Sequence, residues 1–279
     1  MRLNKLLLGG VMALAVGACQ KDEFIDTPVQ PAALVRFIHA VPDTGAMDFR
    51  FVDLVENSSG FGMLFRTLSI STSTGGTFYQ RAAPGARHLR IFMDGLTAAV
   101  ASTIVKDTTL NLVADKFYTV VLHGFARAGS TPALQLSVFE DGPTDPGTQV
   151  GLRVVNLGAG LGAQDVYVSA QGAAVALPAT PTFSNVAYAA ASAYAATAAG
   201  TYQYRTTAPA SVTVVASGNA LAGVAGTTIA NPQPGTSIAG SAVSGFIVPR
   251  SVAGSGAPQA FTTPGVIFLW DRRPPSTSP

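Results

Sequence analysis

The chain has 279 residues, of which 48% are hydrophobic and 11% are charged, and its formal net charge is +2. Because 17 basic side chains are balanced by 15 acidic ones, the chain has no strongly basic field, and we expect no nucleic-acid partner. Cys19 is the only cysteine, which excludes an intramolecular disulfide, so stability must come from buried apolar surface.

The start of the chain has the features of an export signal. Arg2 and Lys5 supply positive charge, and an apolar stretch of eleven residues follows at 6–16. A helix needs about 20 such residues to span a bilayer, so this stretch is too short to be a transmembrane segment. The small pair Gly17-Ala18 directly before Cys19 resembles the lipobox of bacterial lipoproteins.

The lipobox resemblance implies that residues 1–18 are a signal peptide and that Cys19 carries acyl chains, which would hold the protein on a membrane. An ordinary signal peptide followed by an incidental cysteine is the alternative. Gln20 is not the aspartate that commonly retains enterobacterial lipoproteins in the inner membrane, so the resemblance favours an outer-membrane lipoprotein.

Residues 19–33 are predicted to form a lipidated tether. The run Lys21-Asp22-Glu23 is similar to the acidic surface-export signal of some Gram-negative lipoproteins, and its alternative interpretation is a solvated spacer. Pro28 and Pro31 favour an extended segment. Whether the protein faces the periplasm or the exterior stays open at this point.

An internal duplication follows the tether. Residues 34–51 align without a gap with residues 151–168, at an offset of 117, and share Arg, Gly, Ala and Asp at matching places. Farther along, the alignment continues at an offset of 115, where it pairs Tyr79 with Tyr194, Gly85 with Gly200, and Arg90 with Arg205. The register then loosens, and we align Phe117–Gly124 with Ser237–Gly245 and Leu134–Asp141 with Ile267–Asp271.

A repeat of this length is a domain rather than a solenoid unit. We therefore predict a first domain at 34–141, a linker at 142–150, a second, divergent domain at 151–271 and a disordered tail at 272–279.

Each copy has the pattern of short β-strands. Apolar residues alternate with polar ones at 35–37 and again at 49–51, which is typical of a half-buried strand. Turns rich in Gly and Pro separate about seven such segments per copy, so we predict an all-β fold of two tandem immunoglobulin-like antiparallel β-sandwiches. The alanine content of Ala187–Ala199 favours a helix, but its partner Ser69–Ala83 is a poor helix former, and the duplication predicts a strand.

Three segments of the first copy carry a family resemblance: the opening Val35–Asp43, the turn Ala83-Pro84-Gly85 and the strand Phe117–Gly124. They resemble the bacterial family called domain of unknown function 4397. The resemblance is good over the first copy and weaker over the second, which lacks the His and Pro-Asp of the opening. It implies an extracytoplasmic immunoglobulin-like sandwich, often found in lipoproteins or wall-anchored proteins, and it implies no catalytic residue.

The remaining motifs give little chemistry. The glycines at 158–162 resemble a dinucleotide-binding fingerprint, but a strand pattern follows them where a helix would be needed. His39, His88 and His123 lack the paired spacing of a zinc site, and a hydrolase using His39 or His123 with Asp48 is the least favoured interpretation. We predict no catalytic residue, no metal and no cofactor.

Two polar pairs recur in both copies. If the chain turns back near Pro42, Arg36 stands opposite Asp48, and Arg153 stands opposite Asp165 in the same way. Opposite charges across strands stabilise a sheet by roughly 0.2–1 kcal/mol. We predict that both are structural ion pairs.

The second copy has few charges and many tyrosines. Between residues 151 and 270 its charged side chains are Arg153, Asp165, Arg205 and Arg250. Its candidate binding residues are Tyr188, Tyr194, Tyr202 and Tyr204. Tyrosine rings suit a glycan or protein surface; alternatively they fill the sandwich interior, or the two copies pack on each other.

These observations predict a non-enzymatic, lipid-anchored cell-envelope protein that acts as a structural or adhesive surface module. The expected partners are the membrane, through the acyl chains on Cys19, and an envelope protein or glycan. The alternative is a glycan- or peptide-binding lipoprotein that uses the tyrosine-rich second domain or the loops at one sandwich end.

Overall fold

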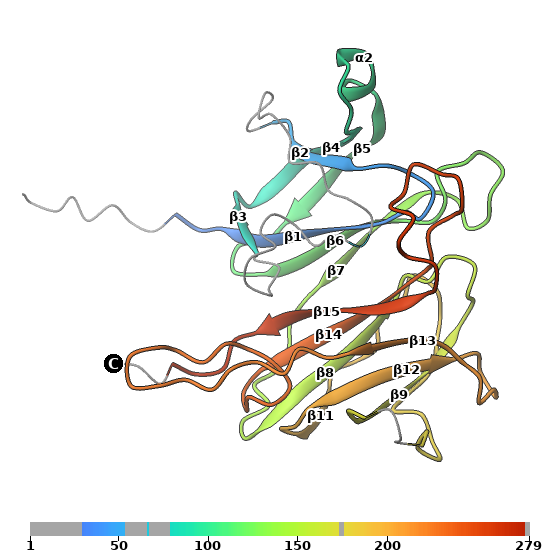
Figure 1. The fold of residues 1–279 in the computed structure, drawn as a ribbon. Helices are drawn as coiled ribbons and strands as arrows, with labels where there is room; N and C mark the ends of the chain where they lie inside the picture. Colours follow the sequence, from blue (N-terminus) through green and yellow to red (C-terminus); the bar gives the residue numbers. More distant parts are fainter. Residues whose placement is uncertain (1–29, 54–65, 67–78, 173–175, 277–279) are drawn as a thin grey trace, which may run out of the picture. The chain divides into compact units, whose positions relative to one another are not determined.

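The computed structural model describes residues 30–53, 66, 79–172 and 176–276 (Figure 1). The predicted signal peptide, Cys19, most of the tether and the last tail residues lie outside this part of the chain. Every strand discussed below lies within the compact unit 31–279. In the part described, no helix has the length and apolar character needed to cross a membrane.

The strands of the first half are β1 (Ala33–Ala40), β2 (Met47–Phe51), β3 (Gln80–Ala82), β4 (Gly85–Met93), β5 (Ile104–Leu112), β6 (Phe117–His123) and β7 (Gln135–Glu140). Those of the second half are β8 (Gln149–Asn156), β9 (Gln164–Ala170), β10 (Phe183–Val186), β11 (Ala195–Ala198), β12 (Tyr202–Thr207), β13 (Val214–Asn219), β14 (Ala242–Val248) and β15 (Gly265–Arg272). One short helix, α2 (Ala98–Ala101), lies between β4 and β5.

Each half is a β-sandwich of two sheets. The first half pairs the sheet β3-β1-β6-β7 with the sheet β2-β4-β5. The second half repeats this order in β11-β8-β14-β15 and β9-β12-β13, and adds β10 at one edge. The predicted all-β sandwich class is confirmed. Strand pairing is antiparallel except for β1 with β6 and β8 with β14, which run parallel in equivalent places.

The predicted hairpin between residues 36 and 48 is wrong. β1 pairs with β3 and β6, so that Arg36 lies opposite Thr119, whereas β2 pairs with β4 in the other sheet. The turn that follows β1 carries the chain across the sandwich instead of folding it back. A Pro-Asp-Thr-Gly turn is compatible with both courses, because the turn residues determine a local reversal and not which sheet receives the next strand.

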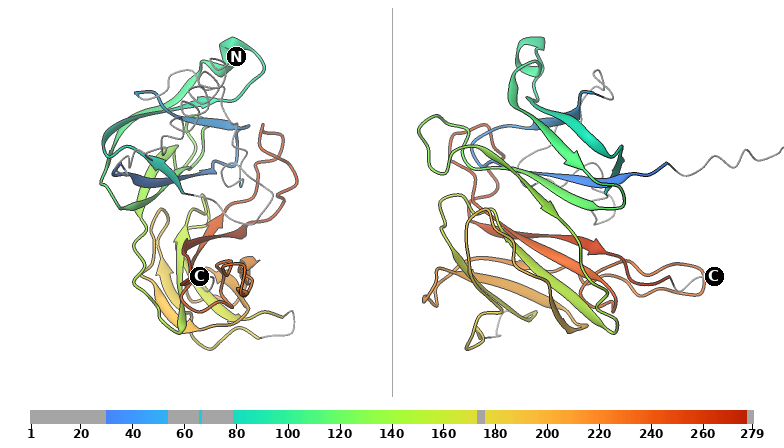
Figure 2. Two further views of the ribbon diagram at one scale, coloured as in Figure 1. Left: turned by 90° about the vertical axis from the view of Figure 1, so that its left-hand side faces the viewer. Right: turned by 180° about the vertical axis from the view of Figure 1, so that it is seen from behind.

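The central strands are buried on both faces, and this corrects the prediction of half-buried strands. In β1, Val35 and Phe37 belong to the core of the first sandwich, while Ile38 and Ala40 point the other way into a cluster shared with the second sandwich. That cluster comprises Ile38, Ala40, Val121, Val155, Leu157, Phe246, Val248 and Leu269. The two four-stranded sheets that contain β1 and β8 therefore pack face to face, as Figures 1 and 2 show.

The structure also corrects the alignment of the copies. Arg36 lies opposite Thr119, and Arg153 lies opposite Ser244, so that β6 is equivalent to β14, whose bounds are Ala242–Val248. The segment we aligned with β6 began five residues too early, at Ser237. Within Ala187–Ala199, residues 195–198 form the strand β11, and no part is helical.

The two cores differ by a compensating pair of residues. Leu89 and Val120 are fully buried in the first core, and by register their equivalents in the second are Tyr204 and Gly245. A Cβ atom built on Gly245 would lie 3.2 Å from the Tyr204 ring and 3.1 Å from Phe268. The absent side chain therefore makes room for the tyrosine. Tyr204 is 0% exposed, so its predicted role as a surface binding residue is wrong.

We predict that Gly245→Val lowers the free energy of unfolding by about 1–3 kcal/mol, because the added methyl groups overpack a filled core. Combining it with Tyr204→Leu, which recreates the pair of the first core, should cost less than the sum of the two single changes. Urea denaturation of the four proteins measures this coupling. Strictly additive losses would contradict the equivalence of the two cores.

Candidate functional site

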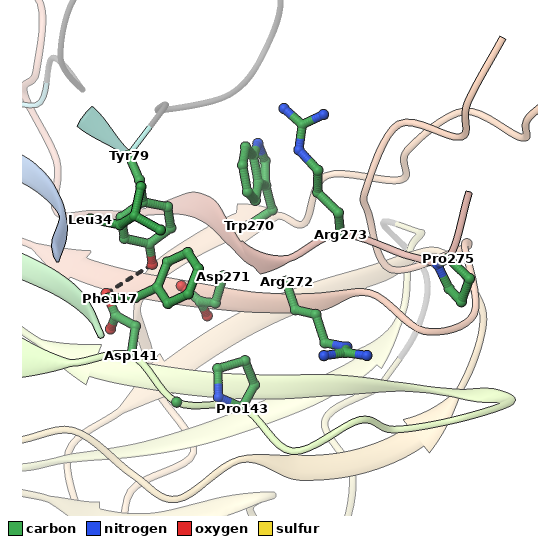
Figure 3. A pocket seen from close by; sticks show the side chains of 11 residues that line it. Leu34, Tyr79, Phe117, Asp141, Pro143, Trp270, Asp271, Arg272, Arg273 and Pro275 are labelled. Carbon is green, nitrogen blue, oxygen red and sulfur yellow. Dashed lines mark hydrogen bonds between the residues drawn. The ribbon is translucent and has the colours of Figure 1, made fainter. Parts of the chain in front are cut away.

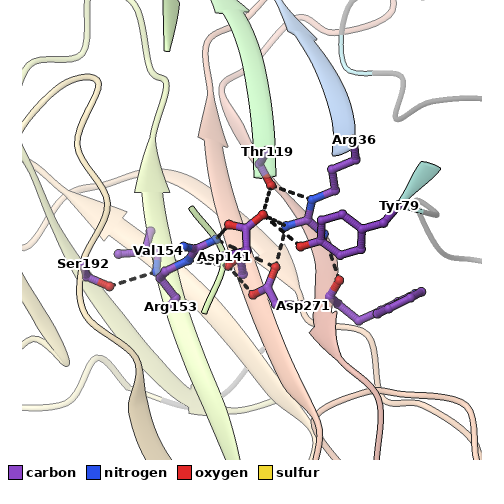
Figure 4. A network of polar contacts seen from close by, with 10 residues as sticks. Arg36, Tyr79, Thr119, Asp141, Arg153, Val154, Ser192 and Asp271 are labelled. Carbon is purple, nitrogen blue, oxygen red and sulfur yellow. Dashed lines mark hydrogen bonds and ion pairs between the residues drawn. The ribbon is translucent and has the colours of Figure 1, made fainter. Parts of the chain in front are cut away.

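The most polar buried feature of the molecule is a cluster of two arginines and two aspartates between the two sandwiches (Figure 4). β1 and β8 place Arg36 and Arg153 at equivalent positions, on the faces that point away from their own cores. Asp141 directly follows β7, and Asp271 lies in β15. Each of these four side chains is at most 4% exposed.

Arg36 makes contacts with residues of both sandwiches. Its Nε donates a hydrogen bond to Oγ1 of Thr119 (2.6 Å), and its Nη1 donates to the carbonyl oxygen of Trp270 (2.8 Å). Its Nη2 binds Asp271 at 2.5 Å and reaches Asp141 at 3.5 Å. The guanidinium also lies over the ring of Tyr79, 4.5 Å from its centroid.

Arg153 repeats the arrangement with equivalent residues. Its Nε donates to Oγ of Ser244 (2.7 Å), its Nη2 binds Asp141, and its guanidinium lies 4.7 Å from the ring centroid of Tyr194. The hydroxyls complete the symmetry, since Thr119 donates to Asp141 and Ser244 donates to Asp271 (2.5 Å). Each arginine thus pairs most closely with the aspartate of the opposite sandwich.

The two arginines stay charged although they are buried. Burial disfavours a charged guanidinium, but the neighbouring Tyr79, Asp271 and Asp141 outweigh it and raise the pKa of Arg36 above its ordinary value. Burial raises the pKa of Tyr79, whose hydroxyl donates to Asp141 at 2.9 Å and therefore stays protonated. Two positive and two negative groups balance one another, so the cluster joins the sandwiches without a net buried charge.

The predicted ion pairs Arg36–Asp48 and Arg153–Asp165 are therefore wrong. Asp48 pairs with Arg50 of its own strand, and Asp165 accepts a hydrogen bond from the backbone N–H of Asn185 (2.7 Å). Sequence reasoning missed Asp141 and Asp271 as the partners. A signal was present, because the two aspartates close the last pair of aligned segments, just as the two arginines recur in the first.

His39 holds a turn. Its Nδ1 accepts the N–H of Val41 (3.2 Å), so the proton lies on Nε2, which donates to the carbonyl of Gly45 (2.9 Å). Asn156, the equivalent residue in the second copy, makes the same two contacts, with Gly158 (3.0 Å) and Gly162 (2.9 Å). Burial lowers the pKa of His39 to about 4. A side chain that asparagine replaces so closely has a structural role.

The other histidines also have identified partners. His123 is buried, with Nδ1 2.6 Å from the hydroxyl of Tyr188 and Nε2 2.8 Å from the hydroxyl of Ser137, and burial lowers its pKa to about 4. His88 is exposed and lies 2.6 Å from Asp107. Within the described ranges, no group of three His, Cys, Asp or Glu side chains is placed to hold a metal ion.

The remaining candidate tyrosines make separate contacts. Tyr188 lies against His123, Tyr194 lies under Arg153, and Tyr202 donates a hydrogen bond to the carbonyl of Ala198 (2.8 Å). All three are half-buried. Ligand binding by Tyr188, Tyr194 or Tyr202 stays a prediction.

Two clefts lie at opposite ends of the β1 and β8 strands. The Trp270 cleft, of about 650 Å³, is lined by Leu34, Tyr79, Phe117, Pro143, Trp270 and Arg273 and borders the ionic cluster (Figure 3). The Arg250 cleft, of about 960 Å³, is lined by Phe125, Leu161, Arg250, Ser251, Phe261 and Thr263, among others.

The comparisons with known proteins bear on the family. Residues 33–167 match the model of a family described as Domain of unknown function (DUF4397). The DUF4397 match contains the whole first sandwich and reaches into β9, and it supports the resemblance seen in the sequence. No curated protein matches the chain. Because the DUF4397 description names no activity, function has to be argued from individual side chains.

We predict that Asp271→Asn lowers the free energy of unfolding by about 3–5 kcal/mol, because it leaves two buried guanidinium groups facing one carboxylate. Asp145→Asn is the matched control. It breaks the ion pair of Asp145 with Arg272, but the Asp145 side chain is 56% exposed, so the loss should stay below about 1 kcal/mol. Chemical denaturation compares the two variants, and similar losses would contradict a structural role for the cluster.

We also predict a pH dependence that His39 causes. The folded state holds His39 neutral down to its pKa of about 4, whereas the unfolded chain takes up the proton near pH 6.5. Acidification between these values therefore favours unfolding, by about 3 kcal/mol at pH 4. His39→Asn, which preserves both turn contacts, should reduce that loss, while His123 still contributes in both proteins. Identical pH profiles of stability would refute the assignment.

Proposed function

We propose that this chain is a non-enzymatic, lipid-anchored protein of the cell envelope, in which two tandem DUF4397-type domains form one structural or adhesive body. The observation that carries the proposal is the exchange of ion pairs between the sandwiches. Arg36 binds Asp271 at 2.5 Å, and Arg153 binds Asp141 in return. Ion pairs buried between two domains fix the arrangement of those domains, as a structural role requires.

Support for a second, divergent copy of the DUF4397 domain comes from equivalences along the whole chain. The strand order is repeated, the parallel pair recurs, and the cluster uses an arginine, a hydroxyl residue, an aspartate and a tyrosine from each half. The family match ends at residue 167, as expected if the second copy has diverged too far for the model.

The proposed absence of catalysis is supported by the engagement of the candidate groups. His39 is used in a turn, His123 lies between Tyr188 and Ser137, and Asp48 pairs with Arg50. A hydrolase would need a base with access to substrate and a neighbouring nucleophile.

The proposed anchor is the acylated Cys19, with the outer membrane as the location. β1 begins at Ala33, so the connection from Cys19 can reach at most about 50 Å when fully extended. The sandwiches would then stay close to the membrane surface, in the periplasm or outside the cell. No nucleic-acid partner is proposed.

The anchor is tested by expressing the full chain and Cys19→Ser in a Gram-negative host. We expect wild type to lose residues 1–18, to carry acyl chains on Cys19 in mass spectra, and to sediment with outer membranes. Cys19→Ser should lack the acyl chains and leave the membrane fraction. Gln20→Asp is the matched control, which should keep the acylation and shift the protein towards the inner membrane. A wild-type chain that is unprocessed and free of lipid would overturn the proposal.

The single body is tested by calorimetry of the chain without its signal peptide. We expect one transition with equal calorimetric and van't Hoff enthalpies, because each arginine loses its closest carboxylate once the other sandwich unfolds. Asp271→Asn should lower the melting temperature of that transition as a whole. Two transitions, of which only one shifts in the variant, would mean that the sandwiches unfold independently.

A second candidate function, glycan or peptide binding, is favoured by the two clefts. Their aromatic side chains and free space suit a ligand better than the scattered tyrosines do.

A further inference from the structure

The Arg250 cleft lies where loops from both sandwiches meet. Phe125 comes from the loop after β6, Leu161 comes from the connection between β8 and β9, and most of the wall is the loop 249–264 between β14 and β15. This loop crosses to the first sandwich, where the N–H of Val252 donates to the carbonyl of Pro42 (2.8 Å). The cleft volume of about 960 Å³ is at the upper end of the range for small-molecule sites.

Arg250 is a cation on the wall of this cleft. It is exposed, and it makes no hydrogen bond, ion pair or ring contact with the part of the chain that the structure describes. Other basic residues of the second sandwich are engaged, since Arg153 lies in the cluster, Arg205 donates to Ser169 and to the carbonyl of Ala176 (2.9 and 2.8 Å), and Arg272 pairs with Asp145.

No acidic side chain within the described ranges neutralises this cation. Between residues 151 and 270 the only acid is Asp165, which is buried and accepts the N–H of Asn185. From the first sandwich, Asp43 approaches this end, but its two oxygens accept the N–H groups of Ala126 and Arg127 (2.9 Å each). An exposed guanidinium that has no carboxylate partner in the part of the chain described is available for an anionic group.

The wall that carries Arg250 is already held in place. Arg66 donates from Nη2 to the carbonyls of Pro249 (2.5 Å) and Thr263 (2.7 Å), and its guanidinium lies 4.7 Å from the ring centroid of Phe261. The N–H of Ser251 donates to the carbonyl of Phe261 (2.8 Å). A site formed before binding loses less entropy when a ligand arrives.

The remaining lining groups suit a sugar. Phe125 and Phe261 line the cleft with apolar surface of the kind on which the C–H groups of a pyranose pack, and Arg66 lies over the Phe261 ring. The hydroxyls of Thr262 and Thr263 make no hydrogen bond among the described residues. Nucleic acid would need several cations along its backbone, and Arg250 alone does not supply them.

We propose that the Arg250 cleft binds an acidic saccharide, whose carboxylate pairs with Arg250 while its ring lies against the phenylalanines. The inference deepens the glycan-binding candidate of the proposed function and rests on it. Guanidinium and carboxylate match in a two-point hydrogen-bonded contact, which makes the carboxylate the group that selects the ligand.

The test is isothermal titration calorimetry with trigalacturonic acid and with its methyl ester, which keeps the rings and removes the charges. We expect wild type to bind the acid and to bind the ester at least tenfold more weakly. Arg250→Gln should lower the affinity for the acid ten- to hundredfold. Because Arg250 is exposed and contacts no described side chain through a hydrogen bond or ion pair, the variant should fold like wild type, and its melting temperature checks this.

Arg273→Gln is the matched control. It removes an equal charge from the Trp270 cleft, where Arg273 lies 4.8 Å from the ring centroid of Trp270, and it should leave the affinity for the acid unchanged. Equal losses in both variants would mean non-specific attraction, and an ester that binds as well as the acid would exclude the carboxylate contact.

Two further outcomes decide the class of ligand. No binding of trigalacturonic acid by wild type overturns the inference. If a tripeptide with a free carboxyl end displaces the bound trigalacturonic acid at a concentration ten times lower than that of the acid, the cleft would be assigned to peptides. Because acylation of Cys19 is measured separately, a failed titration with an intact anchor rejects the cleft inference alone.

Discussion

Everything in this structure depends on two guanidinium groups and two carboxylates that are enclosed between two sheets. Removing such ions from water costs several kcal/mol each, and the cost is recovered only when each group finds a partner at good geometry. Arg36 and Arg153 find their closest carboxylates in the opposite sandwich. The cluster therefore constrains how the sheets face each other, because a shifted or rotated packing would leave a buried charge unpaired.

The surrounding contacts follow from this constraint. Ile38 and Val155 continue the rows that carry the arginines and bury apolar surface on both sides of the cluster. This arrangement of apolar residues around a polar cluster agrees with the usual division of roles, in which apolar burial supplies most of the stability and polar groups select one packing arrangement. On the face that packs against the other sandwich, each of these sheets thus carries one arginine in a row of apolar residues. In a sandwich on its own, this face would be exposed to water.

The two copies have diverged by paired changes that preserve local geometry. Tyr204 and Gly245 fill the volume that Leu89 and Val120 fill in the first core. Asn156 replaces His39 and makes the same two contacts with its turn, although only the histidine can titrate. The second copy has also lost nearly all its charges. Its exposed Arg250 has no partner among the residues that the structure describes, and the loop that presents it is held by Arg66.

The amino-acid sequence by itself determined the duplication, the β class and the recurrence of Arg36 and Arg153, because local alternation and spacing are written along the chain. It also placed a solitary cysteine behind an apolar segment, from which the lipid anchor is predicted. Only the tertiary structure decided which residues meet the arginines. A period-two pattern indicates that the two faces of a strand differ in polarity, but it does not indicate whether the more polar face contacts water or another sheet. Asp271 lies 235 residues from Arg36, and Asp141 is separated from Arg153 by the linker between the two domains. The parallel pairing of β1 with β6 brings Thr119 beside Arg36, and no local turn residue specifies this long-range pairing.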